Sequence, residues 1–134
     1  MPNVSDYMVI DPITLAPGMT VHYARRLLVE HEISGAPVMD ERSRLVGMFT
    51  ERDIIGAVFR SSYHQDPGSS VGECMSPEVE TVEADMDIAE AAKLFLESRY
   101  RRFPVLLDNR VVGLLSRRDV LRAIEDLWRP EVSR

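Results

Sequence analysis

Two stretches of the chain share one pattern: GMFTERD at residues 47–53 and GLLSRRD at residues 113–119. Each runs from a glycine through apolar residues to a hydroxyl residue, and an aspartate follows three positions after that hydroxyl. The two glycines lie 66 residues apart (113 − 47). A pattern that recurs over a long stretch at a fixed distance is typical of two copies of one folding unit.

The repeat extends well beyond these two stretches. Upstream the offset is 67 residues, which aligns Val4 with Val71 (71 − 4) and the Pro-Val pair at 37–38 with the pair at 104–105 (104 − 37). A one-residue deletion in a turn accounts for the change of offset. The residues between the copies are rich in Ser, Asp, Pro and Gly, which favour turns. We therefore predict a first copy at residues 1–60, a linker at 61–70, a second copy at 71–128 and a C-terminal tail at 129–134.

Each copy predicts the same order of elements. A short extended segment comes first, then an amphipathic helix behind Thr20 or Asp87, then two short strands joined by a turn, and last a helix. His31 is expected on the apolar face of the first helix, and Glu90 is expected to form a capping box with Asp87. The order β-α-β-β-α, twice, predicts an α/β (α+β) fold in which helices cover one side of each small sheet. The expected strands are 13–15, 37–39, 45–49, 79–82, 104–107 and 111–115, and the expected closing helices are 51–59 and 117–127.

The composition indicates a globular domain with an acidic surface. The 134 residues are 45% hydrophobic and 28% charged, with a formal net charge of −6. A protein that binds nucleic acid normally has a basic surplus, so no nucleic-acid partner is expected. Cys74 is the only cysteine, which excludes an intramolecular disulfide and favours a reducing cytoplasm. No apolar run approaches the length of a membrane span, so no membrane partner is expected.

The hydroxyl–aspartate pattern allows two interpretations. A hydroxyl residue with an acid three positions later is, in most proteins, a helix cap and nothing more. Two features favour a ligand site: the acid is aspartate in both copies although glutamate reaches the cap amide better, and the glycine recurs, as expected where something approaches the backbone closely. A helix N-terminus offers free amides to a phosphate, and an aspartate can accept two hydrogen bonds from a ribose diol. The pattern therefore suits a nucleotide, with capping alone as the alternative.

An apolar-Pro-Val strand precedes each pattern, at residues 36–38 and 103–105. With these strands, the paired patterns resemble the tandem CBS domain family, whose paired unit is called a Bateman module. The resemblance covers residues 4–127. It implies two motifs packed sheet to sheet around a pseudo-twofold axis, with two clefts between them that usually take adenosine-containing ligands.

The resemblance also implies two sets of ligand-binding residues, each with the hydroxyl and acid of one copy and base-lining residues of the other. In the first set Asp119 would bind the ribose diol and Ser116 the ribose or a phosphate. In the second set Asp53 and Thr50 would do so. The remaining members are Thr14, Ala16, Ile33, Ser34 and Arg118 in the first set, and Arg52, Thr81, Glu83, Tyr100, Arg101 and Arg102 in the second. The bulky residues 100–103 depart from the small residues that the family often has near the base, so the first set is expected to bind the ligand more tightly.

Arginines concentrate in the second copy, at positions 99, 101, 102, 117 and 118. One interpretation is a solvated surface on which they pair with carboxylates. The other is a phosphate site, because planar guanidinium groups match phosphate oxygens well. Arg101 and Arg102 lie at the start of a predicted strand that, by the resemblance, faces a cleft, which favours the phosphate site.

The expected function is that of a non-catalytic regulatory module. It would bind an adenine nucleotide (AMP, ADP, ATP or a related adenosyl ligand such as S-adenosylmethionine) as a regulatory ligand, with no catalytic cofactor, and signal its occupancy to an effector protein. The alternative is a ligand-free structural or dimerisation module. No nucleophile–base pair, carboxylate dyad or metal-ligand set stands out, so neither an enzyme nor a metal site is expected. A homodimer is expected through exposed apolar residues of the closing helices, namely Ile54, Ile55, Val58, Val120, Leu121 and Ile124.

Overall fold

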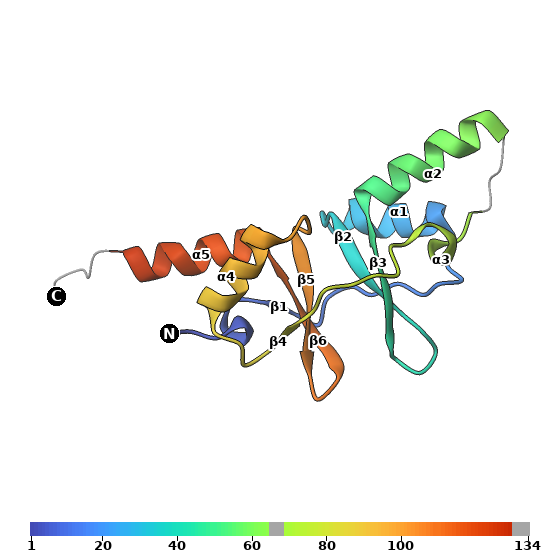
Figure 1. The fold of residues 1–134 in the computed structure, drawn as a ribbon. Helices are drawn as coiled ribbons and strands as arrows, with labels where there is room; N and C mark the ends of the chain where they lie inside the picture. The colour runs from blue at the N-terminus through green and yellow to red at the C-terminus, as the bar shows by residue number, and fades with distance from the viewer. Residues whose placement is uncertain (65–68, 130–134) are drawn as a thin grey trace. The chain divides into compact units, whose positions relative to one another are not determined.

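The computed structural model describes residues 1–64 and 69–129, with only the backbone described for residues 61–64. The chain divides into two compact units (Figure 1). Unit 1 contains Met1–Pro12 and Glu80–Arg134, and unit 2 contains Ile13–Val79. The first twelve residues, which the repeat assigns to the first copy, therefore belong to the same compact unit as the second copy.

Unit 1 is built on a four-stranded sheet. A hairpin forms its centre, and its turn has positive φ at residues 108 and 109 (51° and 63°), as a tight hairpin turn of right-handed strands requires. The fourth strand pairs with the hairpin in parallel and the first pairs antiparallel. The strands are, in spatial order, β1 (Val9–Ile10), β6 (Arg110–Ser116), β5 (Arg102–Leu107) and β4 (Val82–Glu83). Its helices are η1 (Val4–Asp6, a 3-10 turn), α4 (Ile88–Glu97) and α5 (Arg117–Trp128).

Unit 2 repeats this arrangement with shorter outer pairings. Its central hairpin is antiparallel, as in unit 1. A parallel bridge from Leu15 to Val38 corresponds to the pairing of β4 with β5, and an antiparallel bridge from Met48 to Ser76 corresponds to that of β1 with β6. The strands are β2 (Gly35–Met39) and β3 (Leu45–Thr50), and the helices are α1 (Val21–Glu30), α2 (Glu51–His64) and α3 (Val71–Cys74). The predicted α/β fold of two tandem motifs is thus confirmed.

The two units bury equivalent residues, which explains why the repeat is visible in the sequence. Each core draws one apolar residue from each repeat position, for example Val4 and Val71 (offset 67), both of which are fully buried. Where unit 2 pairs a small Ala36 with a large Phe49, unit 1 has Phe103 and Leu115, so the bulk is redistributed between the two hairpin strands. The extra ring in unit 1 stacks on Phe95 of α4 at a centroid distance of 4.3 Å.

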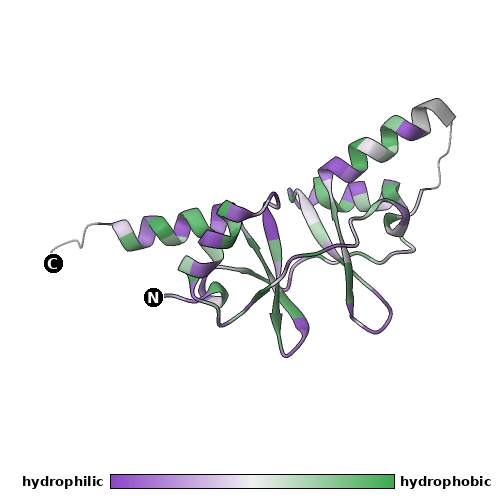
Figure 2. Ribbon diagram, viewed as in Figure 1, coloured by the Kyte–Doolittle hydropathy of each residue, from purple (hydrophilic) through white to green (hydrophobic). Residues whose placement is uncertain are grey.

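The helices contact these cores through one apolar face each. Helix α1 buries Val21, Ala24 and Leu28, and α4 buries residues at the equivalent spacing. Apolar residues three and four positions apart lie on one side of an α-helix, so the opposite side stays polar. Figure 2 shows this as alternating apolar and polar bands along the helices and mostly apolar strands.

Helix α2 is longer than predicted. It runs to His64, so residues 61–64, which were predicted to be linker, form its last turn. No glycine or proline occurs between Gly56 and Pro67 to stop it. Residues 65–68 of the predicted linker and residues 130–134 of the predicted tail lie outside the described residues.

Two predictions about helix ends were wrong. His31 is an exposed residue that follows the last turn of α1, because the helix ends at Glu30 and the chain then turns through Glu32 at a positive φ of 53°. The side chain of Asp87 accepts a hydrogen bond from the amide of Ala89 rather than from Glu90, so the cap of α4 is not the predicted capping box.

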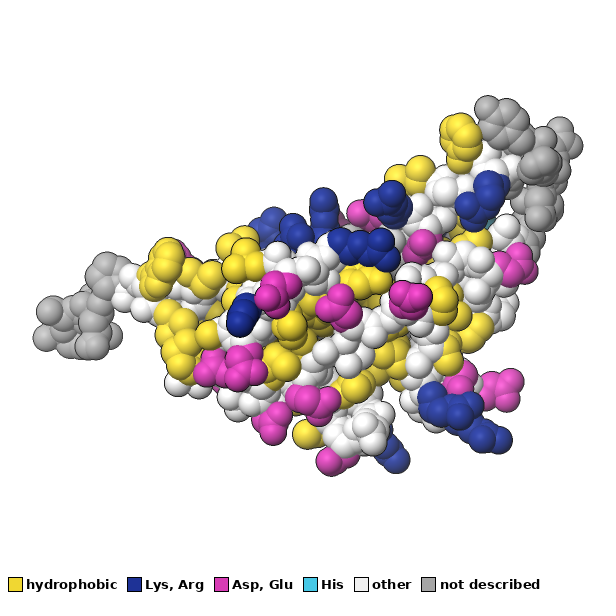
Figure 3. Space-filling model, viewed as in Figure 1, with side chains coloured by type: hydrophobic (Ala, Val, Ile, Leu, Met, Phe, Trp, Pro, Cys, Tyr) yellow, Lys and Arg dark blue, Asp and Glu magenta, His cyan; other side chains and the backbone are white. Residues whose placement is uncertain are grey.

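The apolar face predicted on the closing helices is only partly exposed. Val120 is buried at 6% exposure, and Ile54 and Ile124 pack against the two cores. Phe59 and Trp128 on the same two helices are also exposed. Figure 3 shows apolar side chains on the surface of α2 and of α5. The exposed large apolar residues of these helices are Ile55, Val58, Phe59, Leu121, Leu127 and Trp128.

The recurring glycine is explained by the chain itself and not by a ligand. A Cβ atom on Gly47 would lie 2.8 Å from the carbonyl oxygen of Ser76, and one on Gly113 would lie 2.9 Å from that of Val9 and against the sulfur of Met8. In each unit a neighbouring segment therefore crosses the glycine closely while it pairs with the last strand. The interpretation that the glycine leaves room for a bound molecule is replaced by this packing. Among the described helices, none is long and apolar enough to cross a membrane.

We predict that Gly113→Ala destabilises the protein by ~1–3 kcal/mol, because the methyl group must push back the backbone of β1. Gly18→Ala is the matched control, since a Cβ atom there would meet nothing within 4 Å. Urea unfolding of the two variants and the parent measures both effects. Equal stability of Gly113→Ala and the parent would show that β1 does not pack on this glycine.

Candidate functional site

The second hydroxyl–aspartate pattern forms the N-terminus of α5. Ser116 is the N-cap residue, and its Oγ accepts a hydrogen bond from the amide of Asp119 at 3.3 Å. In return Oδ2 of Asp119 accepts the amide of Ser116 at 2.8 Å, which completes a capping box. Asp119 is only 5% exposed and is the buried charged residue of the described chain. The capping interpretation is therefore correct for this turn, whatever else the aspartate does.

The other carboxylate oxygen of Asp119 is also occupied. Nη2 of Arg122 donates to Oδ1 of Asp119 at 2.9 Å and to the backbone carbonyl of Tyr7 at 3.0 Å. The guanidinium carbon of Arg122 lies 5.8 Å from the centre of the Tyr7 ring. Both oxygens of this buried carboxylate thus have protein partners, as a buried charge requires.

The first pattern forms the N-terminus of α2 with one difference. Oδ2 of Asp53 accepts hydrogen bonds from the amide of Thr50 at 2.8 Å and from its hydroxyl at 3.3 Å. Within the described residues, no hydrogen bond involves Oδ1 of Asp53. Asp53 is half-buried, and this burial raises the pKa of its carboxyl group against the opposing effect of the Thr50 hydrogen bonds. The two turns therefore share the bond from the backbone amide to the aspartate but differ in the role of the hydroxyl group and in the second carboxylate oxygen.

In each unit the segment before the Pro-Val strand reaches the same helix N-terminus. The carbonyl of Ser34 accepts the first amide of α2, that of Glu51, at 2.9 Å. The carbonyl of Arg101 accepts the first amide of α5, that of Arg117, at 3.1 Å. The strand pairings next to these bonds, Gly35 with Thr50 and Arg102 with Ser116, bring the predicted base-lining segment beside the hydroxyl residue of its own unit.

The remaining predicted residues lie around these turns with varied exposure. Thr14 and Ala16 are exposed on either side of buried Leu15. Thr81 is half-buried before β4 and Glu83 is exposed at its end. The members of each predicted set are divided between the units: unit 2 holds Thr14, Ala16, Ile33, Ser34, Thr50, Arg52 and Asp53, and unit 1 holds Thr81, Glu83, Tyr100, Arg101, Arg102, Ser116, Arg118 and Asp119.

The arginines do not behave as one group. Arg52 and Arg118 are exposed on the first turns of α2 and α5, and Arg101 is exposed beside α5. Arg102 is half-buried. Arg99 lies over the ring of Tyr100, with its guanidinium carbon 5.3 Å from the ring centre. Arg52 and Arg118 are therefore the cations at equivalent places next to the two helix N-termini.

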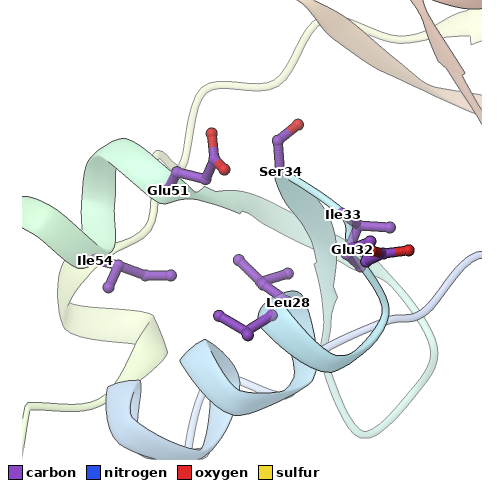
Figure 4. Close-up of a pocket in the computed structure, with 7 residues that line it drawn as sticks. Leu28, Glu32, Ile33, Ser34, Glu51 and Ile54 are labelled. Carbon is purple, nitrogen blue, oxygen red and sulfur yellow. The ribbon is translucent and has the colours of Figure 1, made fainter.

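A pocket of about 370 Å³ lies in unit 2 beside the N-terminus of α2. Figure 4 shows Leu28 and Ile54 on its apolar floor and the side chains of Ser34 and Glu51 at its polar rim. Two residues of the first predicted set, Ile33 and Ser34, thus line a hollow of the size that small ligands occupy. Its other lining residues are Val29 and Glu32. Within residues 1–60 and 69–129, no three His, Cys, Asp or Glu side chains are grouped as a metal site requires.

Comparison with known proteins identifies the family. Residues 4–60 and 71–126 each match the CBS domain. The chain belongs to the CBS domain family. Among solved structures, CBSX2 in complex with AMP superimposes with a TM-score of 0.84 at 30% identity, covering 96% of this chain and 100% of that one. The CBS domain pair of MJ0100 in complex with 5′-methylthioadenosine and S-adenosyl-L-methionine has a TM-score of 0.84 at 26% identity, covering 95% and 98%.

Curated relatives in the family include small proteins and parts of enzymes. The CBS domain-containing protein YhcV of Bacillus subtilis is 31% identical over 120 residues, which cover 90% of this chain and 84% of YhcV. Inosine-5′-monophosphate dehydrogenase of Methanocaldococcus jannaschii is 33% identical over 121 residues, which cover 90% of this chain but 23% of the enzyme. The match therefore covers less than a quarter of that enzyme.

Sequence reasoning missed Arg122 and Tyr7. Arg122 follows Asp119 by three positions, a spacing at which helical side chains meet. Tyr7 comes from the opposite end of the chain, and no local pattern points to it. These two residues distinguish the turn at Asp119 from the turn at Asp53.

We predict opposite pH profiles for two aspartates. The pKa of Asp53 is raised by burial, so the folded state binds a proton more readily than the unfolded state and the contribution of Asp53 to stability falls as pH rises through that window. The free energy of unfolding of the parent minus that of Asp53→Asn should therefore fall as pH rises above the ordinary aspartate pKa of about 4. Urea unfolding at several pH values measures it.

Asp40 is the control for this measurement. The carboxylate of Asp40 accepts hydrogen bonds from the amide of Arg44, from the side chain of Arg44 and from the amide of Arg42. These bonds hold the pKa of Asp40 below its usual value. The stability of the parent relative to Asp40→Asn should therefore be fully present above the ordinary aspartate pKa and be lost as pH falls through the lowered pKa. A rising profile for Asp53 as well would show that its hydrogen bonds to Thr50 outweigh its burial.

Proposed function

We propose that this chain is a regulatory module that binds an adenine nucleotide, AMP, ADP, ATP or a related adenosyl ligand, at its two hydroxyl–aspartate turns. The observation that carries the proposal is the presence of both turns at helix N-termini in a CBS pair. Similar CBS pairs have been solved with AMP and with S-adenosyl-L-methionine. Binding would change the stability or the geometry of the module, and a partner protein would receive the signal.

The chemistry of the turns supports a phosphorylated ligand. An exposed arginine, Arg52 or Arg118, stands one residue before each aspartate in a protein with a net charge of −6. A helix N-terminus and a guanidinium group both favour an anion, and a carboxylate favours the hydroxyl donors of a ribose. A nucleotide offers both partners in one molecule.

The segment that begins at Ile33 supports recognition of the base. Ile33 and Ser34 are half-buried and line the pocket in unit 2, and Gly35 and Ala36 behind them are small. The carbonyl of Ser34 accepts a hydrogen bond from the amide of Glu51, which holds this segment in place. A fixed backbone of small residues can read the polar edge of an adenine.

The second candidate function is a dimerisation module without ligand. The exposed apolar residues of α2 and α5 favour it, since large exposed apolar side chains mark interaction surfaces in small proteins. We propose that dimerisation accompanies ligand binding and does not replace it, because both aspartates are present. The single cysteine fits a reducing cytoplasm, which we propose as the location.

We predict that AMP, ADP, ATP or S-adenosylmethionine raises the melting temperature. A ligand at about 100 times its dissociation constant adds ~2.7 kcal/mol to the free energy of unfolding, which is a shift of several degrees. Thermal-shift assays at millimolar concentrations measure it, with GTP and CTP as controls that carry the same phosphates on other bases. No shift with any adenine compound would favour the ligand-free dimerisation module.

We also predict a homodimer at tens of micromolar protein. Leu121→Lys, at a position of α5 that is 62% exposed, should weaken the dimer at least tenfold, equivalent to ~1.4 kcal/mol. Leu96→Lys is the matched control, because Leu96 is 88% exposed but lies on α4. Sedimentation velocity measures both variants. A parent that sediments as a monomer with and without nucleotide would contradict the prediction.

A further inference from the structure

The two turns share the hydrogen bond from the amide of the hydroxyl residue to the aspartate, but different residues lie around it. The position equivalent to Arg122 is Gly56 in the first copy (122 − 66), so the α2 turn has no arginine there. The positions equivalent to Tyr7 and Asp126 are Cys74 (7 + 67) and Arg60 (126 − 66). The two units thus contain two versions of one site with different neighbouring residues.

In unit 1, Tyr7 and Asp126 hold Arg122 over Asp119. The hydroxyl of Tyr7 donates to Oδ2 of Asp126 at 2.6 Å, which fixes the tyrosine on α5. The carbonyl and ring of the same tyrosine contact the Arg122 guanidinium, which reaches Oδ1 of Asp119 at 2.9 Å. Arg122 itself is 58% exposed, but its carboxylate partner is 7% exposed. Its position is therefore set by three contacts and not by the ion pair alone.

In unit 2, Arg60 makes its hydrogen bond away from the aspartate. Arg60 donates from Nη2 to the sulfur of Cys74 at 3.5 Å, and its Nη1 lies 3.3 Å from where a Cβ atom of Gly56 would be. Neither contact involves Asp53, and Oδ1 of Asp53 has no hydrogen bond among the residues that the structure describes. The α2 turn therefore presents an oxygen that the α5 turn does not.

We propose that Arg122 blocks the ribose-binding oxygen of Asp119, so that the turn at Asp53 is the tighter nucleoside site and the turn at Asp119 binds only when Arg122 is displaced. This inference rests on the proposed function. A diol that binds a carboxylate through two hydroxyl groups needs the oxygen that the helix cap leaves over, and Arg122 occupies it at Asp119. The family resemblance predicts the opposite order, with tighter binding by the set that contains Asp119. That prediction rests on the residues near the base and does not include the contact between Arg122 and Asp119.

Calorimetry with adenosine tests the proposal. Adenosine has the ribose diol and no phosphate, so the loss of a positive charge at Arg122 does not weaken a phosphate contact. We expect Asp53→Asn to abolish most adenosine binding and Asp119→Asn to leave it nearly unchanged. Arg122→Ala should tighten binding at the Asp119 turn by roughly two- to fivefold, the range of a partly exposed ion pair. This gain should be absent with 2′-deoxyadenosine, which has no diol.

Two variants control for side effects. Arg26→Ala removes an arginine of matched exposure (59%) from another helical ion pair, with Glu30, and should leave binding unchanged. Arg122→Gln keeps the length of the side chain without its charge and replaces Arg122→Ala if that variant does not fold. Adenosine binding that depends on Asp119 in the parent, or that weakens in both Arg122 variants, would overturn the inference. If the protein binds AMP but neither Arg122 variant changes adenosine binding, the inference is overturned and the proposed function remains intact. If no variant binds AMP or adenosine, the proposed function itself is overturned.

Discussion

The fold of each unit depends on one hydrogen bond between a backbone amide and the carboxylate three residues later. The amide of Thr50 or Ser116 donates to Oδ2 of Asp53 or Asp119 at 2.8 Å in both units. Strand and helix on either side of this bond both contribute to the core of their unit, so the bond sets the direction in which the helix leaves the sheet. In this position one carboxylate oxygen accepts the cap amide, and the other oxygen takes no part in that bond and has more acceptor capacity for a ligand.

Because the cap uses one carboxylate oxygen of the aspartate, the residues around the other oxygen can differ between the two copies without loss of the fold. The buried positions keep their apolar character, and even the change from Ala36 to Phe103 is balanced by the change from Phe49 to Leu115. Around the caps, by contrast, Tyr7 and Asp126 replace Cys74 and Arg60, and each pair still makes a hydrogen bond. The scaffold fixes where the side chains meet, and their identity decides whether the second carboxylate oxygen is occupied.

Much of this fold could be predicted from the sequence because its signals are local. Apolar periodicity and turn residues predict the hairpins and helices, and the repeat predicts that they occur twice. What could not be predicted depends on residues far apart in the chain. Val9 pairs with Leu114, so the first residues join the second copy. Gly113 leaves room for that segment and Gly47 for the equivalent segment at Ser76, so both glycines serve packing rather than a ligand. Local patterns carry no information about such pairings.

The sequence also could not predict the ion-pair partner of one side chain in the candidate site, that of Arg122. On a helix, Arg122 can pair with Asp119 three residues before it, Glu125 three residues after it or Asp126 four residues after it, and sequence spacing does not choose among them. The choice is made by Tyr7. Its hydroxyl takes Asp126, and its carbonyl draws the guanidinium toward the start of α5, where Asp119 is the remaining acceptor. A residue from the other end of the chain thus decides which carboxylate loses its free oxygen, and with it how the two copies of the site differ.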